Sequence, residues 1–159
     1  GYGGSKAAQW AALTEKQQRT SFKTQPASLH LMRFSYNDWN KQVADGLTIA
    51  AFKTSISTLI SLAQENTSNK AIVLIADPAS STADTNPIKY AEFAQALKDL
   101  AVGKVAYFDV SEAVNSTWST GNSLGYYVDF VHRTEAGYDA EATVFSACLL
   151  DPALLRNIN

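Results

Sequence analysis

Ala71-Ile-Val-Leu-Ile-Ala76 contains six apolar residues in a row. A strand with no alternating polar residues is typical of a parallel sheet that helices cover on both faces. The largely apolar runs Leu29–Phe34 and Val105–Val110 predict two further strands. The turn-type residues Ser35–Asp38 and the pair Asp77-Pro78 are expected to end the first two strands of the chain.

Helical patterns lie between these strands. Apolar residues recur at helical spacing over Thr48–Gln64, which predicts an amphipathic helix. A second helix is expected up to Leu100, with Asn86 as its cap, Pro87 in its first position and Gly103 beyond its end. The remaining expected elements are a helix from Ser5 to about Thr14, a long polar loop up to Tyr126, and a last helix from about Glu135 to Leu149 with Thr134 as a candidate cap.

This alternation predicts an α/β domain in which a parallel sheet lies between two layers of helices. A chain of 159 residues, 46% of them hydrophobic, can bury a core of that size. We therefore expect residues 1–159 to form a single domain without an internal repeat. Ligands of such sheets bind at the carboxyl ends of the strands, so polar residues that follow the strands are the first candidates for a site.

The composition argues against several functional classes. The net charge is −2, charged residues make up 18% of the chain, and no basic cluster stands out, so neither nucleic acid nor a membrane is an expected partner. The longest apolar runs are too short to span a bilayer. Abundant Ser, Thr, Asn and Gln favour an extracellular or virion-associated setting without identifying one.

Cofactor and metal motifs are also missing from the sequence. It contains no P-loop, no G-x-G-x-x-G, no H-E-x-x-H and only two histidines, so we expect neither a cofactor nor a metal ion. Cys148 is the only cysteine, which excludes an internal disulfide. Its apolar neighbours Val144 and Ala147 favour a buried, inert thiol.

Asp129-Phe-Val-His132 carries the clearest chemical signal. It precedes the last expected helix, and an aspartate three residues before a histidine can accept a hydrogen bond from one imidazole nitrogen. The other nitrogen then remains available to take a proton from a nucleophile. The alternative is a surface pair that only flanks the start of a helix.

Two further positions are candidates for the same site. Asn37 follows the strand Leu29–Phe34, where an amide side chain can stabilise an oxyanion. Gly3 and Gly4 precede a helical run, where a backbone N–H can approach a ligand closely. Taken separately, Asn37 and Asp38 form an ordinary turn, and the glycines form a flexible terminus.

Together and in this order, these motifs resemble those of the SGNH hydrolases, also called GDSL esterases. Gly4, or its neighbour Gly3, is similar to the glycine of the family's second sequence block. Ser35-Tyr-Asn-Asp38 resembles the third block, G-x-N-D, with Ser35 in place of the usual glycine.

The last family block, D-x-x-H before the final helix, is the most specific part of the resemblance. Asp129 to His132, followed by Gly137-Tyr138, is similar to it, with Arg133 in place of the usual proline. The family's first block, a G-D-S whose serine is the nucleophile, has no counterpart. We therefore expect the first strand and its serine to lie on a segment outside this chain, so that the SGNH hydrolase-like domain is incomplete at its N-terminus.

The resemblance implies a three-layer α/β/α fold and acyl transfer to a serine, with His132 as the general base and Asp129 orienting it. It also implies that the Gly4 N–H and the Asn37 amide are the oxyanion donors. Substrates of the family include lipids, thioesters and acetylated sugars. Three tryptophans and a polar loop favour acetyl groups on carbohydrate, because sugars stack on aromatic faces.

Other interpretations of the sequence stay open. Gly121-Asn-Ser123-Leu-Gly125 fits the G-x-S-x-G nucleophile elbow, although the residues before it are polar rather than strand-like. Ser5 follows two glycines, as in a degenerate first block, but no apolar strand precedes it. A different class of protein is a non-catalytic carbohydrate-binding or structural module that kept the fold and lost the serine.

Three expected strands are too few for a complete sheet of this family. A bare edge beside Leu29–Phe34 would expose unpaired backbone groups, which invites pairing with another chain. The partner we expect is a second polypeptide that carries the G-D-S strand, the N-terminal part of the same protein. We also expect this chain alone to be neither a stable monomer nor an active esterase, and Asn37 to share one cleft with the free nitrogen of His132.

Overall fold

The fold is a three-layer α/β/α arrangement. The structure is a computed structural model that describes residues 5–12, 29–65, 71–77, 85–114, 117–129 and 132–150. Strands β1 (Leu29–Arg33), β2 (Ala71–Ala76) and β3 (Val105–Asp109) form one parallel sheet in the order β1-β2-β3. The expected α/β class, the parallel sheet and the positions of the three strands are therefore confirmed.

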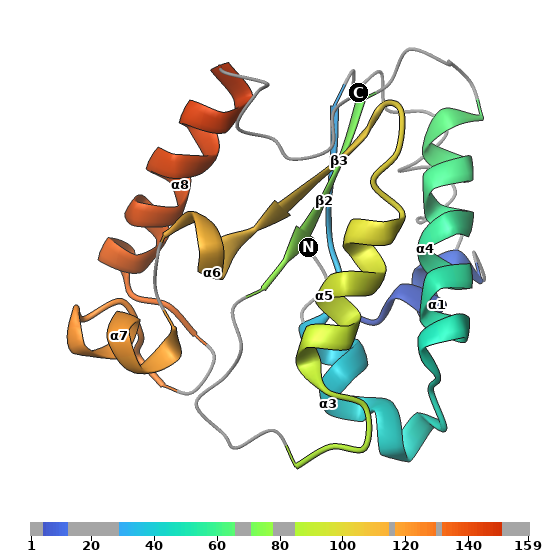
Figure 1. The fold of residues 1–159 in the computed structure, drawn as a ribbon, viewed down its shortest axis with the longest axis horizontal. Coiled ribbons are helices and arrows are strands. Elements are labelled where there is room, and N and C mark those ends of the chain that lie inside the picture. The colour runs from blue at the N-terminus through green and yellow to red at the C-terminus, as the bar shows by residue number, and fades with distance from the viewer. Residues whose placement is uncertain are drawn as a thin grey trace.

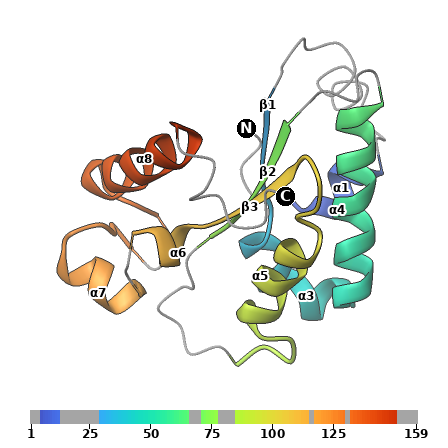
Figure 2. The ribbon, with the colours of Figure 1, turned by 45° about the horizontal axis from the view of Figure 1, so that its top comes forward.

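Helices cover both faces of this sheet (Figures 1 and 2). One layer contains α1 (Ala7–Ala11), α3 (Tyr36–Asp45), α4 (Ile49–Gln64) and α5 (Tyr90–Asp99). The other contains α6 (Val110–Ala113) and α8 (Glu135–Leu150), and α7 (Trp118–Ser123) lies beside the start of α8. Among the described residues, no helix has the length and apolar character that a membrane crossing requires.

Alternate residues of β2 and β3 supply two separate cores, and β1 contributes Met32 to one of them. Met32 and Leu74 face α4 and α5, where Phe52 and Phe93 pack edge to face with ring centroids 5.0 Å apart. The intervening residues of β2 and β3 face α6 and α8. Cys148 of α8 packs in this second core with 5% of its surface exposed, which confirms the expected buried thiol.

Strand β1 forms one edge of the sheet in the described part of the chain, because it pairs only with β2. Leu29 and Leu31 of β1 lie on the same face of the sheet as Val73. They are nevertheless 36% and 52% exposed. Apolar side chains at a strand edge are normally covered. This edge is where the sequence predicts a further strand.

Helix α3 was not expected from the sequence. The residues Ser35–Asp38 follow the end of β1, as expected, but the alternative of an ordinary turn at Asn37 and Asp38 is wrong, because Tyr36 already begins a helix that runs to Asp45. Burial favours the helical conformation here. Trp39 is 5% exposed and packs against Tyr90, with ring centroids 5.8 Å apart. Gly46 then ends the helix in the left-handed conformation (φ 61°), which a residue without a side chain adopts easily.

The predictions for the other helix ends are confirmed in part and wrong in part. Thr134 caps α8 by accepting the Gly137 N–H at 3.2 Å, as expected. Asn86 does not cap α5, which begins at Tyr90, and its amide instead donates to the Trp39 carbonyl at 3.1 Å. The loop expected before Tyr126 contains α6 and α7, and α1 is shorter than expected within the described residues.

Candidate active site

Asp129 and His132 are in direct contact. The Asp129 Oδ2 atom lies 2.7 Å from the His132 Nδ1 atom, and Asp129 Oδ1 accepts the His132 backbone N–H at 2.7 Å. With both carboxylate oxygens engaged, the imidazole is held in one orientation, and its Nε2 atom points away from the carboxylate. The pair lies at the surface, with 76% of the His132 side chain and 49% of the Asp129 side chain exposed.

Backbone pairing holds the loop that carries these two residues. Tyr127 and Arg133 form an isolated antiparallel bridge. The Val128 N–H donates to the His132 carbonyl at 2.8 Å, and the Thr134 N–H donates to the Tyr126 carbonyl at 3.0 Å. These bonds fold the chain back on itself immediately before α8. We refer to the described residues 126–129 and 132–134 as the histidine loop.

Gly137 allows α8 to lie directly against this loop. A Cβ atom added to Gly137 would lie 2.3 Å from the Tyr126 carbonyl oxygen, far inside any normal contact distance. Any larger residue would therefore push the helix away from the histidine loop. The close approach gives a physical reason for glycine in the Gly137-Tyr138 part of the motif.

Asn37 contacts the N-terminal segment in the helical layer on the other face of the sheet from α8. The Asn37 Nδ2 atom donates to the Ser5 carbonyl at 3.2 Å, and the Asp38 carboxylate accepts the Ala7 N–H at 3.1 and 3.3 Å. Gly4 itself lies outside the described residues. An amide nitrogen has two hydrogens, so Asn37 keeps a second N–H for a ligand. The cleft expected between Asn37 and His132 stays a prediction.

Asp38 is a buried acid. Only 1% of the surface of this residue is exposed. Burial raises the pKa of the Asp38 carboxyl to about 6, although the hydrogen bond from Ala7 N–H and the positive charge of Lys6 oppose that shift. The first turn of α3 therefore holds the segment after Gly4 through a group that titrates in a mildly acidic range.

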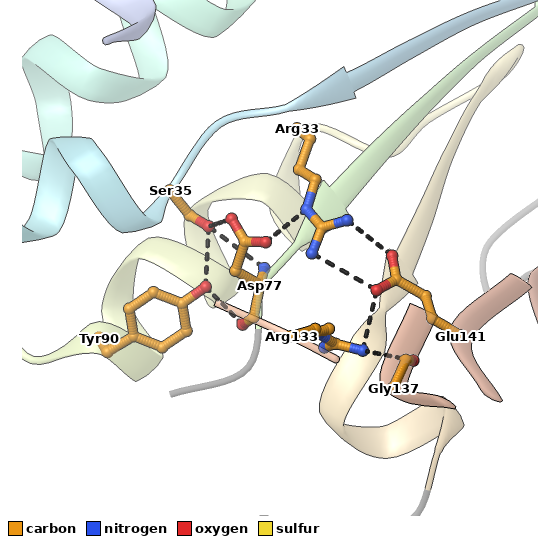
Figure 3. Close-up of polar contacts among 7 residues, drawn as sticks. All are labelled: Arg33, Ser35, Asp77, Tyr90, Arg133, Gly137 and Glu141. Atoms are coloured by element: carbon orange, nitrogen blue, oxygen red, sulfur yellow. Dashed lines mark hydrogen bonds and ion pairs between the residues drawn. The ribbon is translucent and has the colours of Figure 1, made fainter. Parts of the chain in front are cut away.

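A cluster of four charged residues lies between the strand ends and α8 (Figure 3). Arg33 Nε donates to Asp77 Oδ1, and Arg33 Nη1 donates to Glu141 Oε1 at 2.7 Å. Glu141 Oε2 also lies 2.9 Å from Arg133 Nη1. This cluster was not predicted from the sequence, although a charged residue at the end of an apolar strand was a signal for it.

Ser35, which the motif resemblance predicts to stand in place of a glycine, is buried beside the same cluster. It is 1% exposed, and its Oγ atom lies 2.8 Å from the Tyr90 hydroxyl and 3.3 Å from the Asp77 backbone nitrogen, whose N–H it accepts. Burial and the nearby Asp77 charge raise the pKa of Tyr90 well above its ordinary value. These contacts tie the end of β2 to the start of α3.

The G-x-S-x-G segment is not a nucleophile elbow. Ser123 is the last residue of α7, and the element that precedes α7 in the described part of the chain is the helix α6 rather than a strand. The Ser123 Oγ atom donates to the Ser119 carbonyl at 2.9 Å. An elbow requires a strand followed by a sharp turn into a helix. This rival site is therefore excluded by the local structure.

The three tryptophans have different surroundings. Trp39 is buried, and Trp10 packs against the same core beside Phe34. Trp118 lies next to the histidine loop, where its indole Nε1 donates to the Asp129 carbonyl at 3.4 Å and its ring contacts Tyr127. Only Trp118 among the three is thus placed beside the Asp129–His132 pair.

Comparison with known proteins identifies the fold. No protein-family model matches the sequence, and no curated protein matches it. Among solved structures, a peptidoglycan O-acetylesterase superposes with a TM-score of 0.74 at 17% identity, over 96% of this chain and 45% of that one. A salicylyl-acyltransferase from a tetracycline biosynthetic pathway superposes with a TM-score of 0.64 at 16% identity, over 86% of this chain and 41% of that one.

A protein from Lactobacillus plantarum is a third similar structure, with a TM-score of 0.63 at 17% identity, over 90% of this chain and 71% of that one. The chain therefore has the fold of the SGNH hydrolases, which the esterase and the acyltransferase share. It spans less than half the length of these two proteins.

Proposed function

We propose that this chain carries the base and oxyanion-hole half of an SGNH-type serine esterase. The observation that carries the proposal is the 2.7 Å contact between Asp129 Oδ2 and His132 Nδ1 on the loop before the last helix. Asp129 would hold the imidazole in one tautomer, and His132 Nε2 would take the proton from the attacking serine. The exposure of His132 leaves room for a serine and a substrate to approach it.

In this mechanism the Asn37 amide and the Gly4 N–H stabilise the oxyanion of the tetrahedral intermediate. The contact between Asn37 Nδ2 and the Ser5 carbonyl supports their pairing, because Ser5 directly follows Gly4. Asn37 sits in the first turn of α3, and Asp38 holds the same N-terminal segment through Ala7. Donors fixed in this way need little reorganisation when negative charge develops.

The nucleophilic serine would be supplied by a strand that pairs with the open edge of β1. The exposed side chains of Leu29 and Leu31 support this part of the proposal, since a neighbouring strand and its helix would cover them. The carboxyl end of such a parallel strand would lie beside the carboxyl end of β1. Asn37 follows β1 closely at this same end of the sheet.

The substrate we propose is a carbohydrate that carries O-acetyl or other small acyl esters. Trp118 offers a partly exposed aromatic ring beside the histidine loop, on which a sugar ring can stack. The peptidoglycan O-acetylesterase with a similar fold supports the same substrate class.

The test uses this chain together with the proposed serine segment, which we refer to as the complete protein. Acetate release is measured from O-acetylated carbohydrate and from p-nitrophenyl acetate. His132→Ala should lower kcat by about 10³-fold or more, whereas Glu135→Ala, an exposed change at the start of α8, should leave it unchanged. Equal activity in the His132→Ala variant would refute the proposal. Binding of the carbohydrate without cleavage by the unmodified protein would instead favour the non-catalytic module.

A further inference from the structure

Arg133 takes the place of the proline that usually follows the histidine in the motif. Its side chain is buried between the histidine loop and α8. The side chain is 4% exposed. Its guanidinium carbon lies 5.6 Å from the centre of the Tyr127 ring, and Nη1 lies 3.4 Å from the Gly137 carbonyl. Nη2 is buried and has no hydrogen-bond partner among the described residues. The charge of the buried guanidinium is therefore compensated mainly by a single carboxylate.

That carboxylate belongs to Glu141, which contacts two arginines at once. Its Oε2 atom lies 2.9 Å from Arg133 Nη1 and 3.5 Å from Arg33 Nη2, and its Oε1 atom lies 2.7 Å from Arg33 Nη1 (Figure 3). The Glu141 side chain is 12% exposed, so both contacts are largely shielded from water. A carboxylate held between two guanidinium groups has little freedom to move.

The far end of this chain of contacts is fixed to the sheet. Arg33 is the last residue of β1, pairs in register with Ile75, and donates its Nε to Asp77, two residues further along. Burial lowers the pKa of Arg33, but the Asp77 and Glu141 carboxylates outweigh it and raise that pKa, so the guanidinium stays charged. The two arginines and two carboxylates balance in charge.

Glu141 therefore joins two segments that carry different parts of the proposed site. Arg33 is followed closely by Asn37 on α3, and Arg133 is the next residue after His132. We propose that Glu141 is a positioning residue that sets the place of His132 relative to the carboxyl end of β1, acting through Arg33 and Arg133. This inference rests on the proposed function, because it assigns the bridge a purpose in the same reaction.

The competing explanation is that the bridge only stabilises the fold. Buried ion pairs contribute little net stability, since desolvation offsets most of their attraction, but their directional contacts can select one arrangement. The two explanations differ in what a variant should lose. A positioning residue affects turnover in the folded enzyme, and a purely structural residue affects the fraction that is folded.

The test compares variants of the complete protein. Glu141→Gln keeps the shape of the side chain and removes its charge. We expect kcat to fall by about 10- to 100-fold, because small displacements of a catalytic base have effects of that size. KM should stay within about twofold, and the midpoint of the pH–rate profile should match that of the unmodified enzyme, since the Asp129–His132 contact is untouched.

Arg33→Met provides a second variant at the more exposed end of the bridge, where 37% of the side chain is accessible. It should lower kcat to a similar extent, and the double variant should be no slower than either single one, because both changes break the same link. Asp99→Asn is the matched control. It removes an ion pair of 3.0 Å with Lys53, far along the chain from the histidine loop, and should leave kcat unchanged.

Two results would overturn the inference. One is a kcat within twofold of the unmodified enzyme in both single variants, and the other is a double variant whose losses multiply. A crystal structure of Glu141→Gln gives a readout that is independent of activity, since His132 should move by about 1 Å or more relative to β1. If the complete protein has no serine-dependent activity, the proposed function fails, and an unmoved His132 in that crystal structure still overturns the positioning role separately.

Discussion

The Asp38 carboxylate accepts the backbone N–H of Ala7 at 3.1 Å, although the two residues lie 31 positions apart in the chain. This bond fixes the segment that follows Gly4 against the first turn of α3. Asn37, the neighbour of Asp38, binds the same segment through the Ser5 carbonyl. The Asn-Asp dipeptide therefore holds the segment from Ser5 to Ala7 against the start of α3.

The pKa of Asp38 predicts a pH-dependent stability. Its folded value of about 6 lies above the ordinary 3.8, so the folded state binds the proton more tightly. The stability from this group is fully present below about pH 4 and is lost as the pH rises through 6, by roughly 2–3 kcal/mol. Asp38→Asn should remove this dependence.

Urea unfolding at pH values from 4 to 7 measures this effect as the difference between variant and unmodified protein. Asp139→Asn, which changes an exposed carboxylate on α8, serves as the control and should keep the dependence. A difference curve for Asp38→Asn that is flat across this range would contradict the prediction.

On the proposed mechanism, Asn37→Ala should lower kcat by about 10²–10³-fold, because it removes a proposed oxyanion donor. Asn40→Ala removes the same amide from an exposed position on the same helix and should have no effect. Steady-state kinetics on p-nitrophenyl acetate, with circular dichroism to check folding, measures both. Unchanged turnover in Asn37→Ala would leave Asn37 with only its structural contact to Ser5.

Gly137→Ala should destabilise the protein even though alanine is the better helix former. Alanine favours a helix by about 1 kcal/mol over glycine, but its Cβ would lie 2.3 Å from the Tyr126 carbonyl oxygen. We expect a net loss of about 1–3 kcal/mol, measured by thermal or urea unfolding. Ala136→Gly, at the exposed neighbouring position, should cost no more than about 1 kcal/mol. A more stable Gly137→Ala variant would show that α8 can shift freely.

Asp129→Asn should lower kcat by up to about 10⁴-fold, since an amide at this position no longer selects the right imidazole tautomer. Asp139→Asn, an exposed carboxylate on α8, is the control. If both variants retain full turnover on the acetyl ester, Asp129 and His132 are a surface pair at a helix start.

The isolated 159-residue chain is expected to be neither a stable monomer nor reactive toward a fluorophosphonate probe. The exposed edge of β1 should lead to association or incomplete folding, measured by size-exclusion chromatography and sedimentation. Addition of the serine segment should give a defined complex that the probe labels on that segment. Labelling mapped to Ser5 or Ser123 of the isolated chain would identify a different nucleophile.

The sequence predicted those features that depend on short spacing. Periodicity alone located β2 and α4, because a buried strand and an amphipathic helix differ in the repeat of their apolar residues. The contact between Asp129 and His132 was also predictable, since three residues on a pre-helix loop bring the two side chains within reach. Sequence reasoning failed at α3, whose polar first turn is helical because Trp39 and Asp38 are buried by distant segments.

What the sequence by itself determined is the α/β pattern, the three parallel strands and the local Asp129–His132 pair. Only the tertiary structure decided that Glu141 bridges Arg33 and Arg133, and that one of the three tryptophans lies beside the histidine loop. The physical reason is that periodicity and short spacing act within one element. Which charges meet across elements depends on the register of the strands and on how closely α8 packs at Gly137.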